Sequence, residues 1–332
     1  MTISIMTATK DRPEFLKRAL EYYSQSNFDG EILIGDSSST LNSEKILRLV
    51  NQYNKKINIF YYKDVEMSAD QMMSYLTTKV NFDYSVMIND DDILIVSSIK
   101  KCIKFLKENI DYAAVNGRAY NIGIDFNSYR PFGNITYIQK YPLLVSESNE
   151  PFDRIKEFFN NSLNVNMSIT RSKINSLAFN NLMKINKFDS SFVFGELIQG
   201  STIVANGKIA SIDECYLVRQ KHTDQYYRKI DVNNWLKNTN LAKSILELNR
   251  VIQVELLKNS TVVLNDNLKE NINILLSSKI DYILRTMIKK NNKIRVLVRQ
   301  IYNKLANINN NIKTKFNYET IYENDKEPLQ VY

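Results

Sequence analysis

The nine residues Tyr84-Ser85-Val86-Met87-Ile88-Asn89-Asp90-Asp91-Asp92 decide how the whole chain is interpreted. Five mostly apolar residues, typical of a strand, lead directly into an amide and three carboxylates. A short apolar run of this kind is typical of a buried strand in a parallel sheet. In open α/β sheets, ligands bind beyond the carboxyl ends of the strands. The stretch therefore predicts a buried strand that ends at a ligand site.

Two interpretations of the acidic triplet stay open from these residues alone. Three adjacent carboxylates repel one another, and a divalent cation would neutralise them because Mg²⁺ and Mn²⁺ take oxygen ligands. The alternative is a solvated acidic turn in which Asp92 caps the next helix.

The composition is that of a globular protein with an anionic partner. The 332 residues are enough for a large core and for two domains. The formal charge of +8 favours a nucleotide, a nucleic acid or a membrane surface as partner. Cys102 and Cys215 are far apart and form no CxxC pattern, which fits a reducing compartment.

The sequence contains no pattern typical of a targeting signal. The first residues lack the basic and apolar regions of a signal peptide, and no apolar run approaches the roughly 18 residues of a spanning helix. We therefore expect a cytoplasmic protein, or one held at the inner face of the cell membrane.

Strand and helix patterns alternate over the first 115 residues. Apolar positions at spacings of three and four predict helices between five strand-like segments, which are Ile3–Thr7, Glu31–Gly35, Ile57–Tyr62, the stretch ending at Asp92, and Tyr112–Val115. Ser68 and Gln71 predict a capping box at the start of the third helix. This alternation predicts an α/β fold with a doubly wound, mainly parallel sheet.

Two carboxylate-bearing strand ends then fall on the same edge of the sheet, at Asp36 and at Asp90–Asp92. This is the geometry of a nucleotide site. The chain lacks the GxGxxG and GxxxxGK[ST] motifs that cradle phosphates, so a metal ion is the natural substitute.

Three segments resemble the family 2 glycosyltransferases. Residues 3–20 are similar to the opening strand of that family, Glu31–Thr40 to the strand that carries its nucleobase-binding aspartate, and Met87–Asp92 to its DXD region. The resemblance extends over roughly residues 1–225. It implies a GT-A fold, a nucleotide-diphosphate-sugar donor and a divalent metal, Mn²⁺ or Mg²⁺.

The resemblance also implies roles for individual residues. Asp36 would contact the nucleobase, Asp90 would lie at the ribose and Asp91 would bind the metal, while Asn89 stands where many members have the first aspartate of the motif. The remaining donor-binding candidates are Thr7, Thr9, Arg12 and Asp70, the last on a helix where many members have an arginine-asparagine pair. Asp92 and His222 complete the predicted metal ligands.

A catalytic base is predicted in the segment 188–199. Its Gly195-Glu196-Leu197 resembles the family's Gly-Glu-Asp segment, where a carboxylate acts as the base. Apolar neighbours would raise the pKa of Glu196 toward the range useful for a base. A surface glutamate at a helix start is the alternative, and Asp189 is the second candidate base.

His222, the single histidine, lies in a polar stretch after a strand-like segment. A lone histidine is often structural, but GT-A enzymes often take a metal ligand from such a loop, and imidazole is acceptable to Mn²⁺.

The middle of the chain gives weaker signals. We expect residues 116–165 to be irregular, and we expect Arg171 to lie at the surface.

The residues after about 230 follow a helical pattern. We expect a GT-A catalytic domain over 1–228, with a nucleotide-sugar half (1–115) and an acceptor half (116–228), and a helical region over 229–332. Residues 279–315 carry ten basic residues and one acidic residue, a net charge of +9. This amphipathic segment can lie on an anionic membrane or pack on the catalytic domain.

The function predicted from these features is metal-dependent, inverting transfer of a sugar to a hydroxyl of a glycan or lipid-linked glycan, in building a bacterial surface polysaccharide or glycolipid. One alternative is a metal-dependent nucleotidyltransferase, although residues 8–13 lack the expected glycine. The other is a basic nucleic-acid-binding protein, for which no motif is present, so we expect no nucleic-acid partner.

Overall fold

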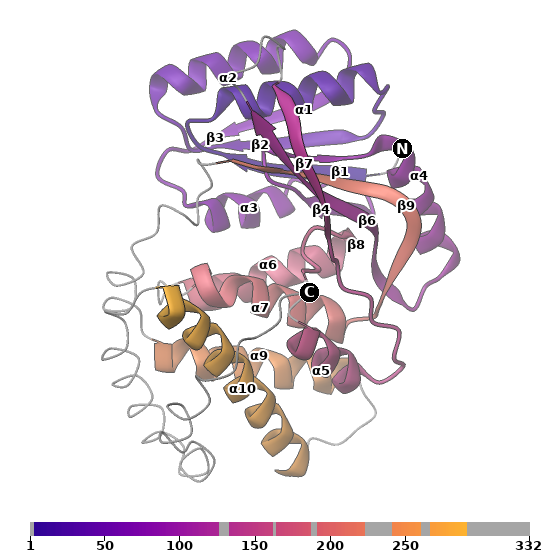
Figure 1. The fold of residues 1–332 in the computed structure, drawn as a ribbon, viewed down its shortest axis with the longest axis vertical. Helices are drawn as coiled ribbons and strands as arrows, with labels where there is room; N and C mark the ends of the chain where they lie inside the picture. Colours follow the sequence, from indigo (N-terminus) through magenta and orange to yellow (C-terminus); the bar gives the residue numbers. More distant parts are fainter. Residues whose placement is uncertain are drawn as a thin grey trace.

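The computed structural model describes residues 3–125, 133–161, 164–186, 191–222, 241–259 and 266–290 (Figure 1). One sheet runs through the molecule, with strand order β3-β2-β1-β4-β8-β6-β9-β5 and with β7 paired to β6. Helices α1 and α2 cover one face of its N-terminal part, and α3 together with a helical layer of α5, α6, α7, α9 and α10 lies on the other side.

The N-terminal half has the predicted alternation. Its elements are β1 (Ile3–Thr9), α1 (Pro13–Gln25), β2 (Glu31–Asp36), α2 (Thr40–Tyr53), β3 (Asn58–Lys63), α3 (Ala69–Thr77) and β4 (Tyr84–Met87). β1 pairs in parallel with β2 and β4, and β2 pairs in parallel with β3. Because Thr9 and Asp36 are register partners, β1 and β2 end side by side at one edge of the sheet.

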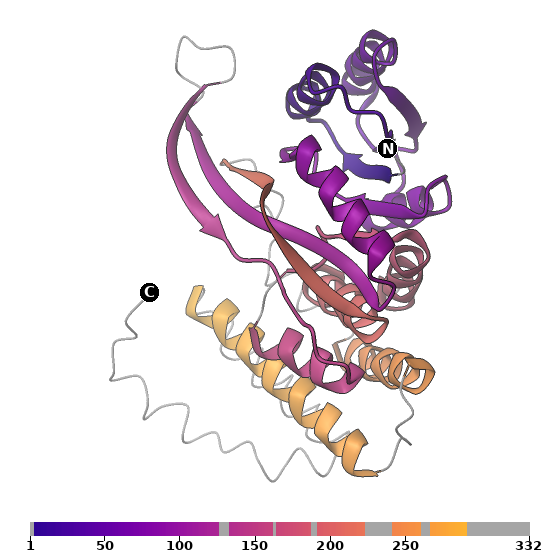
Figure 2. The same cartoon turned by 90° about the vertical axis from the view of Figure 1, so that its right-hand side faces the viewer.

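The second half adds antiparallel pairs. Its elements are β5 (Asp92–Leu94), α4 (Val96–Glu108), β6 (Tyr112–Asp125), β7 (Asn134–Tyr141), α5 (Pro151–Asn161), β8 (Ile169–Arg171), α6 (Ser172–Asn186), α7 (Ser191–Ala205) and β9 (Lys208–Lys221). The expectation that residues 116–165 are irregular is wrong, because most of their described part forms β6, β7 and α5. Figure 2 shows the β6–β7 hairpin curving away from the N-terminal helices, with β7 at its outer side.

Local sequence explains several helix ends. Pro13 occupies the first turn of α1, where its missing N–H costs nothing. Ser68 and Gln71 form the predicted capping box of α3. Asp92 does not cap α4 as one interpretation had it, because Ile95 is the N-cap and Asp92 belongs to β5.

Arg171 has a structural position that differs from the expected surface location. Its guanidinium donates to the carbonyl oxygens of Leu106 (2.8 Å), Asn109 (3.0 Å) and Tyr112 (2.9 Å). Carbonyls at the end of a helix have no intrahelical partner. Arg171 therefore closes the carboxyl end of α4 and ties it to β8.

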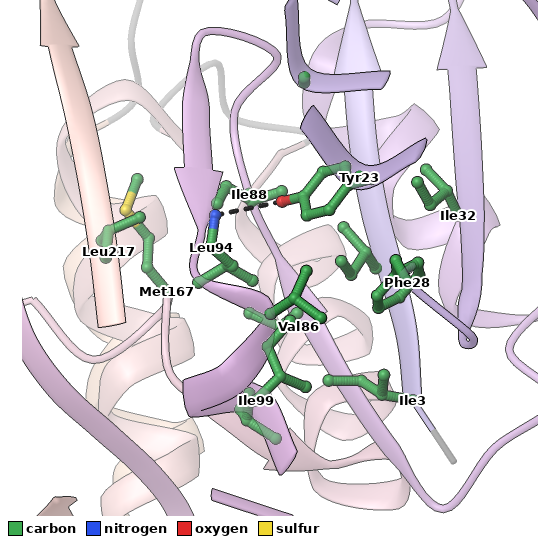
Figure 3. Close-up of a cluster of buried hydrophobic side chains, with 14 of the residues drawn as sticks. Ile3, Tyr23, Phe28, Ile32, Val86, Ile88, Leu94, Ile99, Met167 and Leu217 are labelled. Atoms are coloured by element: carbon green, nitrogen blue, oxygen red, sulfur yellow. Dashed lines mark hydrogen bonds between the residues drawn. The ribbon is translucent and has the colours of Figure 1, made fainter. Parts of the chain in front are cut away.

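One hydrophobic cluster lies between the sheet and the helices α1, α2 and α4. Figure 3 shows part of it, including Ile3, Val86, Ile99 and Leu217 from three strands and one helix. The hydroxyl of Tyr23 accepts a hydrogen bond from the backbone N–H of Leu94 at 3.1 Å. This bond satisfies the phenol inside an apolar environment.

A second cluster joins the sheet to the helical layer. It includes residues from β1 and β2 and extends through α5, α6 and α7 to α9 (Leu241–Asn259) and α10 (Asp266–Lys290). The described helices after residue 228 thus share a hydrophobic core with the sheet and with helices α5, α6 and α7. The predicted boundary at 228 itself lies outside the described residues.

The start of the basic segment is buried in this layer. Ile280 belongs to the second cluster, and Lys279 is 8% exposed and donates to the carbonyl of Phe159 at 3.0 Å. Residues 291–315 lie outside the described part. Across the described helices, none combines the length and apolar character needed to cross a membrane.

Candidate active site

The carboxylate of Asp36 is completely buried at the end of β2. It accepts hydrogen bonds from the backbone N–H of Ser38 at 2.8 Å and from the hydroxyl of Tyr61 at 2.6 Å. Burial and the neighbouring carboxylate both raise the pKa of Tyr61, so the phenol keeps its proton and its donor role. Asp36 is thereby held in one orientation at the edge of the sheet.

Asp11 fastens the loop after β1 to the loop after β2. Its φ of 56° is in the left-handed region, and its backbone N–H donates to Ser38 Oγ at 2.7 Å. Its Oδ1 accepts from the N–H and hydroxyl of Ser39 and from Asn42, and these bonds lower the pKa of Asp11. These hydrogen bonds of Asp11 fix the position of the next residue, Arg12.

Asp90 lies between β1 and the following loop. Its Oδ2 accepts from Thr9 Oγ1 at 2.7 Å, and its Oδ1 is 3.1 Å from Arg12 Nη2. Burial raises the pKa of Asp90 to about 7, against the opposing effect of Arg12. Thr9, Arg12 and Asp90, all three predicted to bind the donor, are therefore brought together, and their role in binding stays a prediction.

Asp91 is held between two nitrogen groups. Its Oδ2 accepts from Arg12 Nη2 at 2.6 Å and lies 2.7 Å from His222 Nε2. Burial acts to raise its pKa, but the bond to His222 and the charge of Arg12 outweigh it, so the pKa is lowered. The ring of Phe15 lies 4.5 Å from both the imidazole of His222 and the guanidinium of Arg12. Asp91 is therefore ionised at the centre of the site.

Asp92 makes different contacts, although it is the next residue. Its oxygens accept from Asn89 Nδ2 (3.1 Å), Arg219 Nε (3.1 Å) and the backbone N–H of Gln220 (3.2 Å), and the residue is 2% exposed. Burial, followed by the charge of Asp91, raises its pKa to about 6. These contacts hold β5 to β9, which gives Asp92 a structural role beside its predicted one as a metal ligand.

Two further residues support Asp91 from the end of β9 and from α1. Gln220 Nε2 donates to the backbone carbonyl of Asp91, and Gln220 Oε1 accepts from Arg18 Nη2 at 2.7 Å. Sequence reasoning missed both residues. The spacing of Arg18 in the predicted helix was visible, but its partner lies 202 positions away.

Glu196 lies on α7 in the second turn, not at the start of a helix. Its side chain is exposed, yet the surrounding protein removes enough hydration to raise its pKa, while the charge of Arg219 acts in the opposite direction. The guanidinium of Arg219 also lies 4.4 Å from the ring centre of Tyr141. Arg219 thus connects the acidic triplet with the candidate base. Asp189 lies outside the described residues.

Thr7 and Asp70 complete the predicted donor set. Thr7 Oγ1 is buried near the end of β1 and finds no hydrogen-bond partner among the described residues. Asp70 is half-buried in the first turn of α3, which follows β3 at the same edge of the sheet. The roles of both residues stay predictions.

The residues around Asp91 fit a divalent cation that completes its shell with substrate oxygens. Within the described ranges, no three His, Cys, Asp or Glu side chains are grouped closely enough to hold a metal alone. Mg²⁺ in nucleotide enzymes commonly takes only one or two carboxylates plus substrate phosphates. Asp91 and His222 supply an oxygen and a nitrogen 2.7 Å apart, a donor pair that Mn²⁺ accepts.

The fold is that of the GT-A glycosyltransferases. Residues 1–349 of Staphylococcus aureus TarS superpose with a TM-score of 0.58 at 14% identity, and the match covers 95% of this chain and 83% of that 1–349 chain. The complex of that protein with UDP-GlcNAc superposes with a TM-score of 0.54 at 15% identity, covering 84% and 72%. No curated protein sequence matches the chain.

Residues 4–167 match the family model described as glycosyl transferase family 2. This stretch, about half of the chain, is a family 2 glycosyltransferase domain, and the protein is a glycosyltransferase. The resemblance inferred from the three motifs is confirmed, and the predicted GT-A architecture with it.

Proposed function

We propose that this enzyme transfers a sugar from a nucleotide-diphosphate-sugar donor to a hydroxyl group of a glycan or lipid-linked glycan acceptor, in the synthesis of a bacterial surface polysaccharide or glycolipid. One observation carries the proposal. The ends of β1, β2 and β4 bring Asp36, Asp90 and Asp91 to one edge of the sheet, and Arg12 and His222 converge there on Asp91. The UDP-GlcNAc complex of the similar TarS fold supports a nucleotide-sugar donor.

Each side chain at this edge has a task in binding the donor. Asp36, fixed by Ser38 and Tyr61, accepts a hydrogen bond from the nucleobase, and Asp90 accepts from the ribose. Asp91 and His222 would hold Mn²⁺ or Mg²⁺, and such an ion would supply Lewis-acid stabilisation of negative charge on the diphosphate. Arg12 adds positive charge beside the same carboxylate.

Glu196 takes the proton of the acceptor hydroxyl. The hydroxyl oxygen forms a bond to the anomeric carbon while the bond to the diphosphate breaks, and the nucleoside diphosphate leaves with the electron pair. Displacement from the face opposite the leaving group inverts the anomeric centre. The raised pKa of Glu196 suits a base that must accept a proton near neutral pH.

A panel of nucleotide-sugars, tested by thermal unfolding with and without Mn²⁺, tests the proposal. Because a ligand that binds the folded state raises its apparent stability, one or a few donors should raise the Tm only when the metal is present. If no UDP-, GDP-, ADP- or dTDP-sugar changes the Tm in the presence of Mn²⁺, the proposed donor site is wrong.

A further inference from the structure

A row of side chains extends from the acidic triplet across neighbouring strands to the β6–β7 hairpin. Asp92 on β5 is the register partner of Arg219 on β9, Arg219 is the partner of Asn121 on β6, and Asn121 is the partner of Gln139 on β7. Register partners in neighbouring strands present their side chains to the same face of the sheet. These four residues therefore form one polar row that begins at the acidic triplet and ends at the edge strand.

Glu196 interacts electrostatically with two side chains of this face. Its charge acts on Tyr141, two residues beyond Gln139 and so on the same face of β7, and the charge of Arg219 acts on Glu196. Arg219 also stacks on the ring of Tyr141. The candidate base is thus close to the inner end of the row.

One feature of the row is unexplained by folding. Asn121 is 7% exposed, yet its Oδ1 accepts no hydrogen bond from any residue that the structure describes. A buried amide oxygen without a donor is costly and points to a ligand that supplies one. Gln139 lies beside it on β7 and is exposed.

An aromatic platform lies at the outer end. Tyr137, opposite Gly123, is 46% exposed, and a Cβ built on Gly123 would lie 2.2 Å from the tyrosine ring. The missing side chain of Gly123 is what lets this ring lie against the backbone of β6. Along β7, alternate residues give this face an aromatic ring (Tyr137), an amide (Gln139) and a second aromatic ring (Tyr141), with no charged group among them.

We propose that this face is the acceptor subsite and that it binds an oligosaccharide. Tyr137 stacks on the apolar C–H face of a sugar ring, and Asn121 and Gln139 hydrogen-bond its hydroxyl groups, with Asn121 Oδ1 accepting. The polar row would then direct the terminal sugar of the bound oligosaccharide toward Glu196. The inference rests on the proposed function and names the site of its second substrate.

Binding of the full-length protein to a printed array of bacterial and eukaryotic glycans tests the subsite. The wild type should bind a restricted set of glycans, and Tyr137→Ala should bind them about fivefold to tenfold more weakly. Gly123→Ala is the second variant, because its Cβ displaces the ring without removing it, and it should weaken binding as well. Ile138→Ala, exposed on the opposite face of the same strand, is the control and should bind as the wild type does.

Binding of no glycan by the wild type, or equal binding by the wild type and Tyr137→Ala, would overturn the subsite. So would a dimer in solution that Tyr137→Ala dissociates, because a second copy would then cover this face. Nucleotide titration of the wild type separates this proposal from the proposed function. If the wild type binds glycans but no nucleotide, the proposed acceptor subsite stands and the proposed donor site is wrong. If it binds nucleotides but no glycan, only the acceptor subsite is wrong.

Discussion

At the scale of single residues, Asp91 is the group on which donor binding depends most. A diphosphate and a carboxylate cluster repel one another unless a divalent ion lies between them. Asp91 carries a carboxylate whose pKa is lowered by His222 and Arg12, whereas Asn89 is neutral and donates to Asp92. The two residues therefore make a matched pair for testing the metal.

We expect Asp91→Asn to lose the Mn²⁺-dependent part of nucleoside-diphosphate binding, and Asn89→Ala to have a much smaller effect. Calorimetric titration with UDP and GDP, each with and without Mn²⁺, measures both. Asp92→Asn should be intermediate, because its carboxylate orders β5 and β9 beside the site. Equal metal enhancement in the wild type and Asp91→Asn would show that the triplet does not bind the metal.

Glu196 is the second residue to test. Glu196→Gln keeps the size of the side chain but cannot accept the acceptor proton, so transfer should fall by roughly 10²–10⁴-fold while nucleotide binding changes little. Glu157→Gln is a control, since that carboxylate lies on α5 and accepts a hydrogen bond from the hydroxyl of Ser146. Near-normal turnover by Glu196→Gln would move the role of base to Asp189 or another group.

The pH dependence of transfer provides an independent test of Glu196. A base must be ionised, so kcat/KM should rise with pH as Glu196 loses its proton. Because the surrounding protein raises its pKa, the midpoint of this acidic limb should lie above 4.5, the ordinary value of the group. The limb should disappear in Glu196→Gln. A limb that persists unchanged in this variant reports another group.

At the scale of secondary structure, the carboxyl end of α4 depends on one side chain from β8. Arg171→Ala would leave the carbonyl oxygens of Leu106, Asn109 and Tyr112 without their shared donor. We expect a loss of about 1–3 kcal/mol in the free energy of unfolding, measured by urea denaturation. Lys173→Ala, an exposed cation two residues away, should change it by less than about 0.5 kcal/mol. Equal stabilities of the two variants would contradict this role for Arg171.

At the scale of the whole molecule, the excess of positive charge is concentrated in residues 279–315. The beginning of this segment is buried, since Ile280 packs in the core, so a truncation there would damage the fold. Four basic residues, at positions 293, 295, 299 and 304, follow in the sequence outside the described residues, and they can be neutralised in the full chain. They make a cleaner test of the predicted peripheral membrane location.

We expect the quadruple change Lys293→Gln, Arg295→Gln, Arg299→Gln and Lys304→Gln to weaken sedimentation with phosphatidylglycerol vesicles. Each basic residue near an anionic surface contributes about 1 kcal/mol, and salt screens the attraction. Phosphatidylcholine vesicles are the uncharged control. Equal sedimentation of the variant and the wild type with anionic vesicles would leave the segment without a role in membrane binding.

The sequence by itself determined the architecture of the N-terminal half and the edge at which the site lies. Three local signals were enough for this prediction: the hydrophobic periodicity, the capping box at Ser68, and the carboxylates that follow two strands. Each depends only on residues close together in the sequence. The long β6–β7 hairpin was missed because its strands lack a clean alternation, and β7 is exposed along nearly its whole length.

Only the tertiary structure decided how three adjacent aspartates differ. Asp91 meets Arg12 from 79 positions away and His222 from 131 positions away, while Asp92 turns to Arg219 on β9. The same applies to Arg171, which a sequence cannot distinguish from a surface arginine, and to the row from Asp92 to Gln139. Pairing across a sheet sets these contacts through register between distant segments, and no local pattern in the chain encodes that register.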